Sequence, residues 1–450
     1  MDYLNFKNIK LLLTIIVSSF LIYLQEYFID FSFYLYYIEL IILTLYIYKF
    51  GIIDYRVGLF IFIVLYSVPI IYDLRFNSCQ IIDELGNGEK ICNKISENFF
   101  YIINYLNAIQ LALISCLINI SSYIKFDSNK KYHLKIIDIS LLIVFSFLFN
   151  NLNWELINES YNLEGISNLV IVFYILSIRM NDCIKKYNKI LIIAIYIFLC
   201  ICFMKIGSRQ FILWALIYFF ICYKLRDGQH FPGIKMNEVI LGLPILFILS
   251  ILSTLVVIYR DKGNLYHISI EGKYGIFEYY DLFVRLFYAE TTYTFYNLTL
   301  VIDYLKYNNS IGAYGLLSDI FMMLIPNSFI SDKYSYINSY NIANINELTP
   351  YGTWFVPGEF ALYFGSPFFV YLTFYLYLYL INYFVRISIY KKSISSVTSY
   401  ALMYVFASIY IVRGSFIGGF KIYISLIILV IILNFIEKKF NHHYFGIPNN

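Results

Sequence analysis

The sequence predicts an all-helical protein that crosses a membrane many times. Of its 450 residues, 60% are hydrophobic and only 14% are charged, whereas soluble globular chains carry about 25% charged residues. Nearly uncharged stretches of about 15 to 20 residues recur from end to end, and about 20 such residues let a helix cross a bilayer. This composition excludes an ordinary soluble protein, and with 21 Gly and 8 Pro it excludes a collagen-like or disordered chain.

Twelve apolar runs, each bounded by charged or polar clusters, are candidate membrane-spanning helices. Some are shorter than a full crossing, so flanking Tyr, Phe and Asn are expected to complete them at the membrane interface. The run 355–385 is long and could instead be a short re-entrant piece followed by a span. The predicted spans are residues 11–25, 32–48, 57–72, 99–119, 136–150, 167–178, 190–204, 211–223, 238–259, 355–385, 397–412 and 422–436.

Positive charges predict the orientation of these spans. Lys7 and Lys10 precede the first run and no small-residue cleavage site follows it, so we expect a retained helix that begins in the cytoplasm. With this orientation, 20 of the 33 Lys and Arg residues lie on the inner side. Six of the other 13 lie in a long outer loop, and the positive-inside rule does not count long loops. Both termini are therefore predicted to be cytoplasmic, and the net charge of +4 is an orientation signal that indicates no nucleic-acid partner.

The chain is predicted to have three consecutive parts. Residues 1–259 hold nine spans, residues 260–354 form a large outer loop, and residues 355–450 hold three spans and a cytoplasmic tail. Because the inner connections are short, the soluble working surface is expected to face outward.

The large outer loop is expected to be structured. Apolar positions recur every three to four residues in 276–290, and a second helical run covers 298–305. The segment 315–325 is apolar but too short to span, and Pro326 follows it. We therefore predict a cap that contains amphipathic helices and lies on or dips into the outer leaflet.

Motifs for several common chemistries are absent from the sequence. It has no phosphate-binding Gly-rich loop, no His-Glu-x-x-His and no Gly-x-Ser-x-Gly elbow, so it gives no support for ATP hydrolysis, zinc proteolysis or α/β-hydrolase chemistry. Among five histidines only His267 lies on the predicted outer side, and the outer loops lack paired aspartates. No metal site and no cofactor are predicted.

Two arginines lie in tight Gly/Ser turns at outer helix ends. Arg209 follows Gly207-Ser208, and Arg413 precedes Gly414-Ser415. An arginine at a helix end can simply reach up to lipid phosphates. Small neighbours, however, let an anion approach closely, and a guanidinium matches a pair of phosphate oxygens. Arg209 and Arg413 are therefore candidates for binding a lipid diphosphate, and Arg260 and Arg285 in the outer loop are further candidates for substrate binding.

Two acidic residues lie within apolar runs. Glu359 is flanked by Pro357 and Gly358 at the start of the tenth span, and a carboxylate in such a place marks a functional site by default. It could act as a general base on a sugar hydroxyl, or it could be a buried glutamate that is hydrogen-bonded to a neighbouring helix. Glu39, in the middle of the second span, has no polar cluster around it and is interpreted as structural.

Aromatic residues could stack on sugar rings in the outer loop. Most of the 48 Tyr and 42 Phe are expected to face lipid or the core. The candidates for sugar contacts are Tyr336, Tyr340, Tyr351 and Trp354.

Two cysteines, Cys79 and Cys92, lie in one predicted outer loop. The outer side of a bacterial-type membrane can be oxidising, so this pair could form a disulfide. The other five cysteines lie in or just inside the spans and are interpreted as small apolar packers.

Taken together, these features resemble the O-antigen polymerases, or Wzy proteins. The shared architecture is about twelve spans with both ends inside and a long outer loop near two-thirds of the chain. The Gly207-Ser208-Arg209 turn is similar to the Gly-x-Arg turn of such polymerases, and the segment 352–365 is similar to their Gly-rich acidic stretch. In some members an outer-loop Arg is followed by Gly after eleven residues, a pattern that neither Arg260 nor Arg285 has.

This resemblance implies a C-type glycosyltransferase at the outer face of the bacterial inner membrane. It would transfer a growing glycan from undecaprenyl diphosphate to a fresh lipid-linked repeat unit, with inversion and without a cofactor. Arg209 and Arg413 would bind the donor diphosphate, Glu359 would be the general base, and the outer loop would hold the sugars. The implied partners are lipid-linked oligosaccharides and, where one is present, a chain-length regulator.

Two alternatives stay open. An O-antigen ligase is similar in span number and outer loop but relies on a histidine in that loop, for which His267 is the candidate here. A flippase for lipid-linked sugars would line a cavity with charges along several spans, and only Glu39, Asp138 and Glu359 lie within apolar runs.

Overall fold

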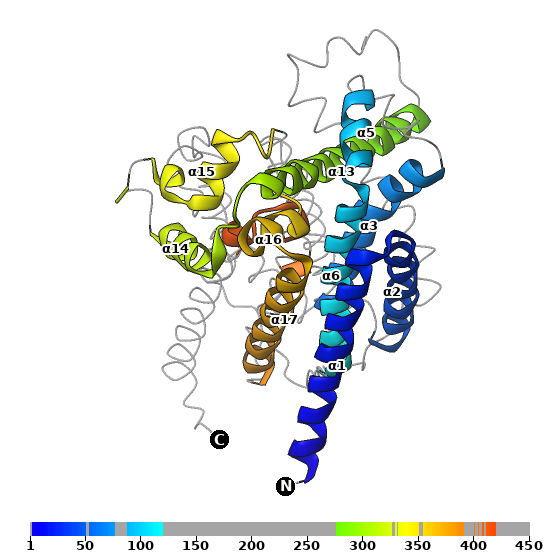
Figure 1. Cartoon of the computed structure of the whole chain (residues 1–450), viewed down its shortest axis with the longest axis vertical. Helices are drawn as coiled ribbons and strands as arrows, with labels where there is room; N and C mark the ends of the chain where they lie inside the picture. Colours follow the sequence, from blue (N-terminus) through cyan, green and yellow to red (C-terminus); the bar gives the residue numbers. More distant parts are fainter. Residues whose placement is uncertain are drawn as a thin grey trace, which may run out of the picture. The chain divides into compact units, whose positions relative to one another are not determined.

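The computed structural model of the chain describes residues 2–50, 54–76, 88–119, 276–325, 329–350 except 331, 354–390, and short stretches between 400 and 419. All regular secondary structure in these ranges is helical (Figure 1). The chain divides into two compact units. Nearly all described residues belong to the unit formed by Met1–Tyr123, Val284–Phe384 and Phe406–Phe420, which therefore draws on all three predicted parts.

Four described helices are long and apolar enough to cross a membrane, as expected for a helical membrane protein. Each contains one of the first four predicted spans. The predicted spans between residues 136 and 259 and at 422–436 lie outside the described residues, and 397–412 is described only in part. The four helices are α1 (Asp2–Tyr27), α2 (Ile29–Phe50), α3 (Tyr55–Phe76) and α6 (Phe99–Asn119).

The long run 355–385 forms two helices, α16 (Val356–Phe364) and α17 (Pro367–Tyr390), which are bent by 112°. The bend follows from its sequence, because Gly365 adopts a φ of 73° that favours glycine and Pro367 cannot continue a helix hydrogen-bond ladder. The Tyr105 hydroxyl of α6 donates a hydrogen bond to the Gly365 carbonyl and holds the bend in place. Of the two possibilities for this run, the structure has the short helix followed by a long one.

The described residues of the predicted outer loop form the helices α13 (Ile276–Tyr307), α14 (Gly312–Leu324) and α15 (Asn338–Ile345) and the 3-10 turn η2 (Lys333–Tyr336). The two runs expected at 276–290 and 298–305 are joined in the single helix α13. The joining residues include three threonines and are poor helix formers. They are nevertheless helical because Thr291, Thr292 and Thr294 are buried, so tertiary packing outweighs local propensity.

Polar side chains connect the first helices within the apolar core. Asn104 of α6 accepts a hydrogen bond from Ser32 Oγ of α2 at 2.9 Å, and its carbonyl accepts one from Gln25 Nε2 of α1 at 3.2 Å. Asn107 Nδ2 in turn donates to Gln25 Oε1 at 2.9 Å. Lipid provides no hydrophobic driving force for helix association, so such hydrogen bonds, together with close packing, help to specify which helices pair.

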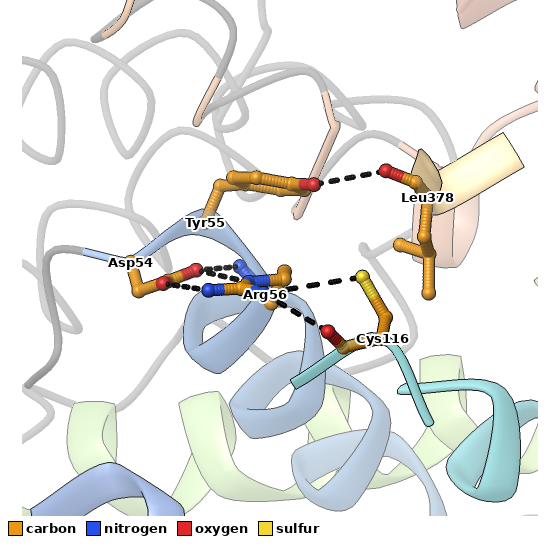
Figure 2. Close-up of polar contacts among 5 residues, drawn as sticks. All are labelled: Asp54, Tyr55, Arg56, Cys116 and Leu378. Atoms are coloured by element: carbon orange, nitrogen blue, oxygen red, sulfur yellow. Dashed lines mark hydrogen bonds and ion pairs between the residues drawn. The ribbon is translucent and has the colours of Figure 1, made fainter. Parts of the chain in front are cut away.

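A buried ion pair stabilises the start of α3 (Figure 2). Arg56 and Asp54 are both fully buried, and the guanidinium donates to both carboxylate oxygens at 2.9 and 2.6 Å. Arg56 Nη1 also donates to the Cys116 carbonyl in the last turn of α6 at 3.3 Å, while the Tyr55 hydroxyl donates to the Leu378 carbonyl of α17 at 3.2 Å. Arg56 is one of the 20 basic residues predicted to lie on the inner side, and the structure pairs its charge with Asp54 inside the protein.

Candidate functional site

Glu359 lies in the first turn of α16 and is fully buried. Its Oε1 accepts hydrogen bonds from Ser415 Oγ at 2.8 Å and from the Ile417 N–H at 3.5 Å, and its Oε2 accepts one from the Phe416 N–H. Residues 416–419 form a helical turn. The carboxylate therefore sits at the N-terminal end of that turn, where backbone N–H groups have no helical partner and a negative charge is favourable.

These bonds connect the candidate Glu359 to the turn that follows the candidate Arg413, although the two lie far apart in the chain. Arg413 ends the short helix α19 (Ile411–Arg413), and Ser415 and Phe416 follow it closely. Glu359 therefore fixes the backbone of the Gly/Ser turn that follows Arg413 against the start of α16. The arrangement is that of the alternative considered for Glu359, a buried glutamate hydrogen-bonded to a neighbouring segment. Its role as a general base stays a prediction.

A second buried carboxylate, Asp319 of α14, lies close enough to Glu359 for an electrostatic interaction. Its Oδ1 accepts from the backbone and side-chain nitrogens of Asn338 at 2.7 and 2.8 Å, and its Oδ2 accepts from the Ser339 N–H at 2.9 Å. The Tyr363 hydroxyl of α16 donates to the same Oδ2 at 2.6 Å. Asp319 thus caps the N-terminus of α15 and ties it to α16.

Asp319 has only a weak signal in the sequence. Like Glu359, it is a lone charge in an apolar stretch, here between residues 315 and 325, but this stretch is too short to be a span. Tyr363 follows Glu359 by four residues on the same face of α16 and interacts with both carboxylates.

A buried lysine completes the connection between the loop helices. Lys333 of η2 is 2% exposed, and its Nζ donates to the carbonyls of Met323 and Ile325 at the end of α14. A cation is favourable there, because the last carbonyls of a helix carry partial negative charge. Together, Lys333 and Asp319 hold α14, η2 and α15 as one body against α16 (Figure 1).

The aromatic candidates differ in their exposure. Tyr336 is 61% exposed, and Tyr340 is half-buried with its ring 5.5 Å from that of Tyr334. Trp354 is only 5% exposed, so little of its indole face can stack on a sugar, and its burial favours a packing role. Tyr351 lies outside the described residues.

Several other candidate residues are described incompletely or not at all. Arg209, Arg260 and Cys79 lie outside the described residues, and Arg285 and Arg413 are described only as backbone positions in their helices. Cys92, in α5 (Gly88–Glu97), is disulfide-bonded. Its pairing with Cys79 stays a prediction.

No known protein family, curated protein or solved structure matches the chain. In the part of the chain that the structure describes, no group of three or more His, Cys, Asp or Glu side chains could hold a metal ion.

The candidate site consists of the turn that follows Arg413, two buried carboxylates and the loop helices that these carboxylates hold together.

Proposed function

We propose that this protein polymerises oligosaccharide repeat units linked to undecaprenyl diphosphate at the outer face of a bacterial inner membrane. In this proposal the chain crosses the membrane about twelve times and both termini are cytoplasmic. The observation that carries the proposal is the set of hydrogen bonds from residues 415–417 to Glu359. Two groups chosen independently from the sequence, a turn that follows an arginine and an acidic helix start, are adjacent in the fold.

The proposed chemistry is glycosyl transfer with inversion. The bond between the donor's anomeric carbon and its diphosphate oxygen breaks, and the electron pair of that bond leaves with the diphosphate. An acceptor hydroxyl oxygen bonds to the same carbon from the opposite face, and the hydroxyl proton passes to a general base or to water. Arg209 and Arg413 would stabilise the charge that develops on the leaving diphosphate. The proposal needs no divalent ion, since two guanidinium groups can supply the positive charge.

In this mechanism the contacts of Glu359 support a positioning role. A carboxylate has about four acceptor sites, and three donors already occupy sites on this buried group. We expect Glu359→Gln to slow transfer by about 10-fold, because its NH₂ group would face backbone N–H donors and displace the turn after Arg413. The pH dependence of the rate should keep its shape. Ser415→Ala, which removes one of the bonds, is the matched variant and should slow transfer less.

A general base would give a different result. Its loss typically costs about 10² to 10⁴ in rate, and the acid limb of the pH–rate profile would disappear in Glu359→Gln. That outcome would contradict the positioning role and restore Glu359 as the base.

The function itself is tested by reconstitution. Purified protein in liposomes would be supplied with lipid-linked repeat units extracted from a host strain that lacks this chain. We expect a ladder of lipid-linked glycans of two or more repeats, separated by gel electrophoresis, and single repeats only in protein-free liposomes. Transfer to a lipid A core without lengthening would indicate a ligase instead, and movement of repeat units across the bilayer without transfer would indicate a flippase.

A further inference from the structure

Glu39 is a buried carboxyl group in the middle of a candidate membrane span. It lies in α2, is 1% exposed, and neither of its carboxyl oxygens has a hydrogen-bond partner. Within α2 it is the only charged residue between Asp30 and Lys49. Its situation is therefore the opposite of that of Glu359, whose two oxygens are both hydrogen-bonded.

The polar side chain that interacts with Glu39 is Tyr36, one turn earlier in α2. The Tyr36 hydroxyl is hydrogen-bonded to Ser67 of α3 at 2.9 Å and also interacts with Gln110 of α6. Buried carboxyl oxygens without a partner, such as those of Glu39, are uncommon, since nearly all buried polar side chains are hydrogen-bonded.

Among the described helices, α1, α3 and α6 pack against α2, and no described positive charge in them neutralises Glu39. The helix α6 contains no charged residue, and Tyr36 is the titratable side chain that interacts with Glu39. The charged residues of α1 and α3 lie toward the helix ends, and none of those whose side chains are described forms an ion pair with Glu39. They are Asp2, Lys7, Lys10 and Glu26 in α1, and Arg56, Asp73 and Arg75 in α3.

We propose that Glu39, next to Tyr36, forms a proton-binding site among the candidate membrane helices. An isolated carboxylate in an apolar interior costs several kcal/mol, so a bound cation must neutralise it. A proton does this and turns one of the two unpartnered carboxyl oxygens into a donor. This site lies apart from the residues assigned to glycosyl transfer and does not depend on that function.

The test uses a hydrophobic carbodiimide, which reacts with protonated carboxyl groups in apolar surroundings. The acid O–H adds across a C=N bond of the reagent and no group leaves, so each labelled chain gains the mass of one carbodiimide. We expect label on the peptide that contains Glu39 in the purified full-length protein at neutral pH, measured by mass spectrometry. The label should be lost in Glu39→Gln and should decrease as the pH is raised. Asp303, which is ion-paired with Lys94 and Lys306, is the internal control and should stay unlabelled.

A second measurement covers the case in which the reagent cannot reach the site. Infrared spectra of the wild-type protein should contain a carbonyl band from a protonated carboxylic acid, and Glu39→Gln should lose that band. Protection from labelling by Na⁺ at constant pH would overturn the proposal in favour of a sodium site. Absence of both the label and the infrared band would overturn it as well.

Discussion

Replacing Arg413 with Ala is expected to lower the rate of repeat-unit transfer by about 10²- to 10³-fold, the loss seen when one preorganised charge-stabilising group is removed. The reason is that charge develops on the diphosphate only as it leaves, so a group that meets this charge acts mainly in the transition state. The backbone next to Arg413 is held by buried hydrogen bonds to Glu359. The variant should therefore still fold, and its rate would be measured in the liposome assay.

Two matched variants make this prediction specific. Arg413→Lys keeps the positive charge but loses the planar fork that matches two phosphate oxygens, so its rate should fall between those of the wild type and Arg413→Ala. Arg75, in the last turn of α3, is exposed and lies 5.1 Å from the centre of the Phe33 ring. Arg75→Ala should leave the rate nearly unchanged. An equal loss of transfer rate in Arg75→Ala and Arg413→Ala would show that Arg413 has no specific role in stabilising the leaving diphosphate.

Replacing Asp54 with Ala is expected to destabilise the protein by about 3–5 kcal/mol, because it leaves the Arg56 guanidinium buried without its counter-charge. Arg56 is fully buried and donates to both oxygens of Asp54. The same carboxylate also accepts from the Arg56 N–H at 3.0 Å and so caps the start of α3. The loss would be measured as a shift of the unfolding midpoint in detergent.

The comparison with a double variant separates the ion pair from simple packing. Replacing Asp54 and Arg56 together by apolar residues of similar size should cost less than Asp54→Ala alone, since no charge is then left unpaired. Asp303 is the surface control: it pairs with Lys94 and Lys306, is 21% exposed, and Asp303→Asn should cost only about 0.2–1 kcal/mol. A double variant as unstable as Asp54→Ala would show that the loss does not come from an unpaired buried charge.

The helices of this protein could be predicted from local sequence because their main determinant, apolar composition, is a local property. The first four spans and the helical nature of the outer loop were predicted in this way. The bend in 355–385 was also foreseeable, since Gly365, Ser366 and Pro367 interrupt an apolar run. Lone charges in apolar surroundings were equally visible, and they singled out both Glu39 and Glu359.

The hydrogen-bond partners of each of those charges could be seen only in the tertiary structure. Glu39 and Glu359 look alike in sequence, yet one has no hydrogen-bond partner and the other accepts bonds from a segment 56 to 58 residues away. Arg56 counts in the sequence as one of the positive charges of the inner side, and the fold pairs it with the buried Asp54. The physical reason is that the free energy of a buried charge depends on which donors and counter-charges reach it. Those partners come from distant segments whose approach no local pattern encodes, whereas an apolar run favours a membrane helix wherever it occurs.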